Sequence, residues 1–383
     1  MRIGIAGPID PRRVAAALGV DDAGLPAGLG GSAATSIVVA LLRAGHEVCV
    51  YSLSPDVDED VHYEVGPVRM HFGTYRAQHR ARDFFKVERA AIERFVRLDP
   101  ADVVHAHWTY EFALGALAAR PGTIVSVHDW APTILRLNKN PYRLVRLLMN
   151  RRVLRAAKRV VCNSPYTFEK VKRVATGKVC MIPNMLQAEQ YACGPRTSRA
   201  GYRMLAAASW GRLKNGKTLL RAFRTARQEL PRAELLLCGD GFGPGQDAET
   251  WARAHGCHEG VSFIGHTSHS DLSRLMFRSD VFIHPSLEES FGMVLAEAMA
   301  QGTPVIAGAS SGAVPWLLAD GAAGVLTDIR DPAAIARAAV GLLSDAEAWR
   351  RYSEAGFARA RDTFHEGVVV PELERVYREM LDR

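Results

Sequence analysis

The sequence predicts an α/β protein made of two doubly wound domains in tandem that face each other across a cleft. Three observations support this class. The chain has 383 residues, which is long for a single hydrophobic core and comfortable for two. Short apolar runs alternate with helix-length segments along both halves, as expected of parallel strands covered by helices. Turn residues interrupt this alternation at 194–201. We therefore place the domains at 1–190 and 191–364, with a last helix at 365–383.

The first domain is expected to begin with a strand at 2–6, a long loop reaching Gly30 and Gly31, a helix at 32–43 and a strand at 47–52. A strand, a glycine-rich loop and a helix in this order are typical of nucleotide-binding topologies. Because Ala33 holds the last position of the Gly-x-Gly-x-x-Gly pattern, we discount a nicotinamide or flavin cofactor. Later strands are expected around 65–72, 102–107, 123–128, 159–163 and 179–182, and helices around 80–97, 112–119, 141–157 and 166–174.

The second domain repeats the alternation of apolar runs and helix-length segments. Its strands are expected at 203–209, 233–238, 261–264, 281–285, 305–307 and 324–326. One helix is expected to begin near residue 218, and another is expected to end at Gly302. Further helices are expected at 332–343, 347–361 and 367–381.

Composition indicates an ordinary globular protein, with 48% hydrophobic and 23% charged residues. The first residues lack the apolar run of a signal peptide, and no run approaches the ~18 apolar residues of a membrane span. Six scattered cysteines show no metal-ligand spacing, so we expect reduced thiols and a cytoplasmic protein. The net charge of +7 belongs to the first half, and between Arg136 and Lys178 13 basic residues accompany the single acid Glu169.

The most informative stretch runs from Ser286 to Gly302. It follows a buried strand and contains Glu289 and Gly292 in a loop. Glu297 comes next, on a helix in which we expect about two turns to precede it. Loops at the carboxyl ends of parallel strands bind ligands, and the first amides of a helix suit phosphate. A fully helical segment would separate the two carboxylates by roughly 12 Å, too far for the ~5 Å pair of a retaining glycosidase. An extended ligand with hydroxyls at both ends and a diphosphate between them, such as a sugar nucleotide, fits this spacing.

The run Glu-Ser-Phe-Gly-Met-Val-Leu-Ala-Glu-Ala, with seven residues between Glu289 and Glu297, resembles the signature of the retaining glycosyltransferases of family 4. The resemblance implies two Rossmann-like domains in the GT-B arrangement, with the last helix packing back on the first, acceptor-side domain. It also implies that the second domain binds a nucleotide-sugar donor. The donor-binding residues that we carry over are Gly30, Gly31, Arg212, Lys217, Glu289, Phe291, Gly292, Met293, Val294 and Glu297. Trp316 departs from the family pattern, which has Glu at this position.

Arg212 and Lys217 follow the first strand of the second domain and resemble the family's diphosphate clamp. Arg can hold phosphate oxygens in a bidentate fork, and Lys adds a compact charge. In the first domain the resemblance selects His128, which ends a strand, as a residue near the transferred sugar. His107 is a weaker candidate of the same kind. The catalytic residues that we expect are therefore Glu289, His128, Arg212 and Lys217.

These residues suggest how transfer would proceed. Arg212, Lys217 and the amides of residues 292–294 would stabilise the charge that develops on the departing diphosphate. Glu289 would hold sugar hydroxyls and Glu297 the ribose hydroxyls. The resemblance implies retention of anomeric configuration, and because the clamp supplies positive charge we expect no metal and no cofactor. Asp-x-Asp patterns at residues 56–60 match a metal motif of other glycosyltransferases, but an acidic solvated loop explains them better.

Several alternatives stay open from the sequence. The same fold could carry a sugar-nucleotide epimerase or hydrolase, or a catalytically silent sugar- or lipid-binding subunit. The nucleotide base, UDP or GDP, the sugar and the acceptor, a glycan, a lipid-linked saccharide or a small molecule, are not specified. The basic helix expected at 143–159 has either a solvated polar face or an affinity for an anionic membrane surface, as a peripheral protein would. We do not expect nucleic acid binding, because no recognised binding module accompanies the charge.

Overall fold

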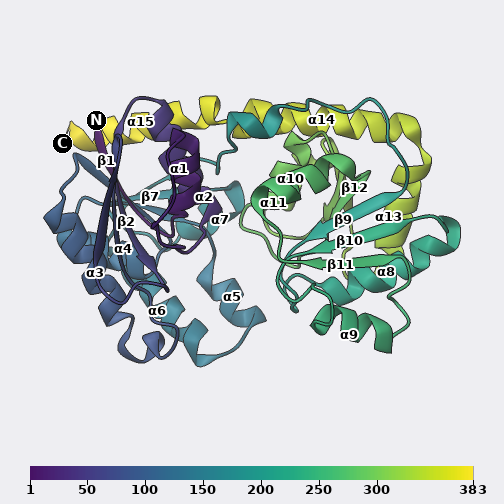
Figure 1. Cartoon of the computed structure of the whole chain (residues 1–383), viewed down its shortest axis with the longest axis horizontal. Coiled ribbons are helices and arrows are strands. Elements are labelled where there is room, and N and C mark those ends of the chain that lie inside the picture. Colours follow the sequence, from purple (N-terminus) through teal and green to yellow (C-terminus); the bar gives the residue numbers. More distant parts are fainter. Residues whose placement is uncertain (383) are drawn as a thin grey trace. The chain divides into compact units, whose positions relative to one another are not determined.

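The computed structural model describes residues 1–382 and divides the chain into two compact units (Figure 1). Unit 1 comprises Met1–Met185 together with the carboxyl-terminal segment from Glu366. Unit 2 comprises Leu186–His365. The last helix therefore belongs to the first unit although it follows the second in the sequence. Within the described residues, no helix has both the length and the apolar character needed to cross a bilayer.

Each unit is built on one sheet whose strands are mostly parallel. The sheet of unit 1 has the order β3-β4-β2-β1-β5-β6-β7-β8, in which only the β3–β4 pair is antiparallel. The sheet of unit 2 has the order β11-β10-β9-β12-β13-β14, and all of its pairs are parallel. These orders confirm the predicted fold class of two doubly wound α/β domains.

Both sheets are covered by helices on their two faces, as the alternation of core residues shows. Ile3 and Ile5 of β1 belong to one buried cluster of unit 1, whereas Ala6 belongs to another. In unit 2, Met204 and Leu205 of β9 likewise enter different clusters. Successive side chains of a strand point to opposite faces, so each sheet lies between two hydrophobic layers.

Unit 1 contains eight strands and nine helical segments among its described residues. The strands are β1 (Arg2–Ala6), β2 (Glu47–Ser54), β3 (Val61–Val65), β4 (Val68–Thr74), β5 (Val103–His107), β6 (Ile124–Val127), β7 (Arg159–Cys162) and β8 (Lys178–Met181). The helices are α1 (Pro11–Leu18), α2 (Ser32–Arg43), the 3-10 turn η1 (Arg80–Asp83), α3 (Lys86–Leu98), α4 (Glu111–Ala119), α5 (Ala131–Leu137), α6 (Pro141–Ala156), α7 (Pro165–Val171) and α15 (Glu366–Leu381).

Unit 2 continues the alternation from residue 186. Its strands are β9 (Arg203–Ala207), β10 (Glu234–Cys238), β11 (Val261–Gly265), β12 (Val281–His284), β13 (Val305–Gly308) and β14 (Val325–Thr327). Its helices are η2 (Ala188–Tyr191), α8 (Gly216–Glu229), α9 (Asp247–Ala254), α10 (His269–Arg278), α11 (Met293–Ala300), α12 (Val314–Leu317), η3 (Ala319–Gly321), α13 (Pro332–Ser344) and α14 (Ala346–Phe364).

Two expectations for the first domain were wrong in detail. The loop expected after β1 contains the helix α1, which Asp10 caps by accepting hydrogen bonds from the amides of Arg12 and Arg13. The strand expected at 65–72 is present as β4, at Val68–Thr74, but β3 was not expected; it pairs with β4 in a hairpin whose turn contains Gly66 at a positive φ of 57°. Neither change moves the carboxyl ends of β1, β5 and β6, where the expected site residues lie.

Candidate functional site

Glu289 is the centre of the candidate site in unit 2. It lies in the loop between β12 and α11, and its side chain is only 13% exposed. Lys214 Nζ donates a hydrogen bond of 2.5 Å to Glu289 Oε1, and His284 Nε2, at the end of β12, lies 2.8 Å from the same oxygen. Burial alone would raise the pKa of Glu289, but the hydrogen bonds and charges of His284 and Lys214 lower it well below its usual range. The structure therefore holds Glu289 as a carboxylate.

The backbone of the Glu289 loop is fixed by the segment that follows β13. The amide of Ala313 donates to the carbonyl oxygen of Glu289 at 2.9 Å, and Ser311 Oγ donates to the carbonyl oxygen of Ser286 at 2.7 Å. Gly312 has a φ of 62°, and a Cβ there would lie 2.1 Å from the carbonyl oxygen of Glu289. Only glycine fits this approach, so the loop is positioned by close backbone contact.

The loop after β9 brings Lys214 to Glu289. The amide of Leu287 donates to the carbonyl oxygen of Leu213 at 2.8 Å, which ties this loop to the Glu289 loop. Asn215, with a φ of 56°, begins α8, and its side chain donates to the carbonyl oxygen of Ile329 at 2.7 Å. Lys214 therefore stands just before the helix, where the two loops meet.

Neither Arg212 nor Lys217, the two residues of the expected clamp, contacts Glu289 in the structure. Lys217 lies in the first turn of α8, is exposed, and places its Nζ 5.7 Å from the ring centre of Trp251. Arg212 is exposed in the same loop as Lys214. The sequence analysis missed Lys214. The signal that could have found it is Asn215-Gly216, which marks the helix start and leaves Lys214 rather than Lys217 in the loop.

The start of α11 has the geometry expected of an anion site. Gly292 has a φ of 98° and precedes the first helical residue, Met293. The first amides of a helix, here those of Met293 and Val294, have no acceptor within the helix itself. Positive helix-dipole charge gathers at the same end. An anionic group can therefore be held by backbone atoms at this point.

Glu297 is the fifth residue of α11. About one helical turn therefore precedes it, whereas the sequence analysis expected about two. Its side chain is 9% exposed, and His269 Nε2 lies 3.3 Å from its Oε1. The segment from Ser286 to Gly292 is not helical, so the separation of 12 Å inferred for a continuous helix does not apply. His269, on α10, is a second neighbour that the sequence analysis did not identify.

The side chain of Phe291 lies in the core of unit 2 and not at the surface, where a ligand could contact it. It is 1% exposed, and its ring packs edge-on against Trp316 and Phe364, with centroid separations of 6.1 and 5.2 Å. Its side chain is thus part of the core beneath the loop. Trp316, the residue that departs from the family pattern, belongs to this aromatic cluster and also lies under the guanidinium of Arg359, 5.5 Å away.

In unit 1, three histidines lie together at the carboxyl ends of β5 and β6. His107 Nδ1 lies 2.8 Å from His128 Nε2, and His105 contacts the hydroxyl of Tyr377 on α15 at 2.8 Å and Ser126 Oγ at 2.7 Å. Burial lowers the pKa of His128 to about 4. Burial, with a smaller effect of His128, lowers the pKa of His105 to about 3, and burial also holds the pKa of His107 well below its usual value. The three rings are therefore neutral at pH 7.

The two glycines expected to bind the donor lie between β1 and α2. Gly31 caps α2, and a Cβ there would lie 2.3 Å from the carbonyl oxygen of Pro8. Gly30 has a φ of 61° with open space beside it. Close packing explains why residue 31 is a glycine, whereas the backbone at Gly30 is accessible.

Acidic side chains in the loop after β2 bind neighbouring groups of the protein. Asp56 accepts from the amide of Ala27 at 2.8 Å and from Ser54 Oγ, and Asp60 pairs with Arg94 at 2.6 Å. Across residues 1–382, no three His, Cys, Asp or Glu side chains come together as a metal site would require.

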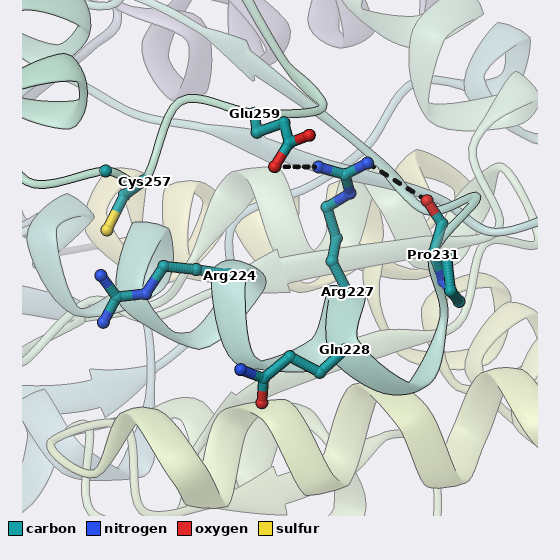
Figure 2. A pocket seen from close by; sticks show the side chains of 7 residues that line it. Arg224, Arg227, Gln228, Pro231, Cys257 and Glu259 are labelled. Atoms are coloured by element: carbon teal, nitrogen blue, oxygen red, sulfur yellow. Dashed lines mark hydrogen bonds and ion pairs between the residues drawn. The ribbon is translucent and has the colours of Figure 1, made fainter.

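A surface hollow of about 310 Å³ on unit 2 lies at the far end of α8 from Lys214 (Figure 2). Arg227 pairs there with Glu259 at 3.4 Å and donates to the carbonyl oxygen of Pro231 at 3.2 Å. Arg224 donates to the carbonyl oxygen of His255 at 3.1 Å. These arginines fasten the end of α8 to the loop before β11, and we do not include them in the site.

Two family models match the chain in succession. The model described as Glycosyltransferase Family 4 matches residues 31–190, and the model described as Glycosyl transferases group 1 matches residues 202–359. The chain belongs to glycosyltransferase family 4. The two matches cover most of unit 1 and most of unit 2, including every site residue described above except Gly30.

Curated relatives of this family match parts of the chain. A D-inositol 3-phosphate glycosyltransferase of Streptomyces avermitilis is 30% identical over 262 residues, which cover 62% of this chain and 56% of the relative. A phosphatidyl-myo-inositol mannosyltransferase of Mycobacterium leprae is 32% identical over 201 residues, covering 51% of this chain and 52% of the relative. In these two alignments the chain spans about half the length of the curated relatives, and for a D-inositol 3-phosphate glycosyltransferase of Corynebacterium kroppenstedtii it spans 31%.

Solved structures share the fold over the whole chain. Sucrose-phosphate synthase of Thermosynechococcus elongatus superposes with a TM-score of 0.79 at 20% identity, covering 100% of this chain and 99% of that one. HepE of Anabaena, solved in complex with UDP-glucose, has a TM-score of 0.71 at 17% identity and covers 99% and 100%. At these identities the likeness concerns the fold.

Proposed function

We propose that the protein is a retaining, metal-independent glycosyltransferase that moves a sugar from a nucleoside diphosphate donor to an acceptor hydroxyl. The observation that carries this proposal is the ionised Glu289, held by Lys214 and His284 in the loop that leads to the first amides of α11. A carboxylate and an anion-binding helix start within one loop match the two ends of a sugar diphosphate. Family membership makes glycosyl transfer the reaction to test first.

In this proposal, each group has a defined role. The diphosphate binds at the amides of Met293 and Val294, with Arg212 and Lys214 supplying positive charge as the anomeric bond breaks. Glu289 accepts hydrogen bonds from sugar hydroxyls, and Glu297 accepts them from the ribose. In this proposal Lys214 takes the place that the sequence analysis gave to Lys217, because Lys214 Nζ lies at the Glu289 loop whereas Lys217 Nζ lies near the ring of Trp251. Since these cations can neutralise the leaving group, the proposed reaction needs no divalent ion.

Unit 1 would contribute the acceptor side, with His128 near the transferred sugar and Gly30 and Gly31 near the donor phosphates. A neutral His128 can exchange hydrogen bonds with a sugar hydroxyl without adding charge. The acceptor is a hydroxyl of a glycan, a lipid-linked saccharide or a small molecule. We place the reaction in the cytoplasm, where nucleotide sugars would be the donors.

The test is a thermal-shift series with UDP, GDP, ADP and dTDP in the presence of a chelator. UDP is the first choice because one neighbour of the same fold was solved with UDP-glucose. A nucleotide at a hundredfold over its dissociation constant adds about 2.7 kcal/mol to the free energy of unfolding. We expect one nucleotide to stabilise the wild type and to lose most of this effect in Lys214→Ala.

The absence of a shift with every nucleotide, in chelator and with added Mg²⁺, would contradict the donor site. Incubation with the matching nucleotide sugar then separates the related functions. A glycosylated product supports the proposal, whereas isomerised donor or free sugar without any acceptor would favour an epimerase or a hydrolase. Tight binding without turnover would favour a silent binding subunit.

A further inference from the structure

The basic segment of unit 1 forms a surface whose side chains differ from those of an ordinary solvated helix. One face of α6 packs into unit 1 and buries Leu147, Asn150, Val153 and Leu154. The residues at 144, 148, 151 and 155 share another face of the helix and are all exposed. Two of them are apolar, since Leu144 is 49% and Leu148 is 42% exposed. The outward face of α6 therefore presents two leucines and then two arginines, each pair about one turn apart.

Both exposed leucines open into hollows with mixed apolar and basic walls. Leu144 lines a hollow of about 540 Å³ between α5 and α6, together with Pro132 and Leu135, and with Arg136 and Lys139 at its edge. Leu148 lines another of about 250 Å³, together with Phe84, which is 41% exposed, and with Arg89 and Arg152. Hollows lined by both apolar and cationic side chains suit a phase that is apolar inside and anionic at its boundary.

The cations of this surface have no carboxylates to neutralise them. Among the described residues, Arg136, Lys139, Arg151 and Arg155 have no ion-pair partner. On α15, by contrast, Arg375 pairs with Glu372 and Glu379, and Arg378 pairs with Glu374. Arg146 and Arg159 are buried in pairs with Glu111 and Glu379, so these two basic residues of the segment serve the fold. The charge of Arg136, Lys139, Arg151 and Arg155 is left for an external anion.

From this arrangement we propose that the outward face of α5 and α6 docks on an anionic lipid bilayer. We call this face the α5–α6 surface, defined by Arg136, Lys139, Leu144, Leu148, Arg151 and Arg155. The leucines enter the boundary between head groups and acyl chains, and the cations contact lipid phosphates. A nucleic acid or another soluble polyanion would use the arginines but gain little from the exposed leucines.

The α5–α6 surface also bears on the acceptor of the proposed function. Helix α5 begins three residues after His128, at the same carboxyl edge of the sheet. A protein held at the bilayer by this face would meet acceptors embedded in the membrane surface. The acceptor class that fits is a lipid-linked or lipid-head-group hydroxyl, a statement that rests on the proposed function, whereas the docking itself does not.

Sedimentation with vesicles tests the docking without donor or acceptor, so its result is independent of glycosyl transfer. Vesicles of phosphatidylcholine alone are compared with vesicles that also contain phosphatidylglycerol, at low and at high salt. We expect binding only to the anionic vesicles and a loss of binding as salt rises. Each basic residue near such a surface strengthens binding by roughly fivefold, so Arg151→Gln/Arg155→Gln should weaken it by roughly 25-fold.

The matched control is Arg232→Gln/Arg278→Gln, which removes the same charge from two exposed arginines of unit 2 that have no ion-pair partner within the described chain. This control should bind as the wild type does. Leu144→Ser/Leu148→Ser should also weaken binding while the net charge stays the same. Melting temperatures of all variants close to the wild-type value establish that the fold is intact.

Three results would overturn the proposal. Binding that ignores lipid charge would exclude electrostatic docking. Equal losses in the two double arginine variants would show that net charge rather than the α5–α6 surface governs attraction. Undiminished binding of the double serine variant would point to a soluble polyanion as the natural partner instead of a bilayer.

Discussion

Lys214 Nζ lies 2.5 Å from Glu289 Oε1, and this contact joins the loop after β9 to the loop after β12. The two strands are neighbours in the sheet, with Met204 opposite Val281, although 77 residues separate these partners in the sequence. Lys217, three residues later, faces Trp251 from within α8. The contact places Lys214, and not Lys217, beside Glu289.

Replacing each lysine by alanine should therefore have unequal effects. A donor that stabilises developing negative charge typically contributes about 100- to 1,000-fold in kcat. We expect Lys214→Ala to lose activity in this range and to lose nucleotide stabilisation. Lys217→Ala should lose far less activity than Lys214→Ala, because Lys217 Nζ lies near the ring of Trp251 rather than at Glu289. Initial-rate kinetics with the donor identified by thermal shift provide the measurement.

The reverse ranking, with Lys217→Ala inactive and Lys214→Ala active, would contradict the placement of the clamp. Lys214→Arg serves as a further check. It keeps the charge but changes the geometry, so a partial recovery of activity would support a charge-based role for Lys214.

The sequence was sufficient for most of the fold because local patterns determine it. The first strand, Arg2–Ala6, and the helix Ser32–Arg43 have the predicted bounds, since a buried apolar run and a glycine end are local signals. Helix α1 was missed although Asp10-Pro11 is a typical helix start. The hairpin of β3 and β4 was missed because an exposed edge strand has no continuous apolar run.

The candidate site was only partly predictable, for a different reason. Glu289, Gly292 and Glu297 lie in one segment, so their spacing could be interpreted from the sequence alone. Lys214 and His269 become neighbours of Glu289 and Glu297 only when the segments after β9 and β11 meet the segment after β12. His284 lies five residues before Glu289, but its pairing with this carboxylate depends on how the loop after β12 turns. Choosing between Lys214 and Lys217 also required the position at which α8 begins, and helix boundaries are the least certain feature of a sequence.

The charge of Glu289 should make a measurable contribution to stability that depends on pH. Its pKa is lower in the folded chain than in the unfolded chain, so its contribution is fully present above the unfolded value of about 4.3. It declines as the pH falls from there towards the folded value. We expect Glu289→Gln to lower the free energy of unfolding by about 1.5–3 kcal/mol at pH 7, since two charge-assisted hydrogen bonds are weakened.

Urea unfolding of wild type and Glu289→Gln at pH 7 and at pH 3.5 checks this expectation. The difference between the two proteins should shrink at the lower pH. Glu259→Gln is the matched control, because the Glu259 side chain is 86% exposed in its pair with Arg227 and should change stability by less than about 1 kcal/mol. A difference that is independent of pH would show that the charge of Glu289 is not the cause.

The neutral histidines of unit 1 should make the protein less stable in mild acid. Burial lowers the pKa of His105 to about 3, against 6.5 for an unperturbed imidazole. The unfolded chain therefore binds more protons than the folded chain between these values, and stability is lost as the pH falls below 6.5. We expect His105→Asn to be less stable than the wild type at pH 7 but to lose less stability between pH 7 and pH 5.

Denaturant midpoints at pH 7, 6 and 5 measure this difference in slope. His266→Asn is the control, since the His266 side chain is 87% exposed and its replacement should leave the slope unchanged. If His105→Asn and the wild type lose stability in parallel, proton uptake by His105 does not contribute to acid sensitivity, and the burial of this ring would have to be compensated in the protonated state.

The contact between Gly312 and the Glu289 loop leads to a prediction about binding as well as stability. A non-glycine residue at a φ of 62° loses roughly 1–2 kcal/mol of stability from backbone strain alone. Gly312→Ala would also place its Cβ against the carbonyl oxygen of Glu289 and displace that loop. Gly256 has a φ of 61° with no atom within 4 Å of the corresponding Cβ, so Gly256→Ala carries the same strain without the clash.

We expect Gly256→Ala to lower the free energy of unfolding by the strain alone and to bind the nucleotide sugar as the wild type does. Gly312→Ala should be less stable than Gly256→Ala and should bind the nucleotide sugar more weakly, because Glu289, which holds the sugar hydroxyls in the proposed function, moves from its place beside Lys214. Calorimetric titration with the nucleotide sugar, at a temperature where both variants are folded, separates the two effects. Equal affinities would show that the Glu289 loop tolerates displacement, and the fixed position of this carboxylate would then have no part in donor binding.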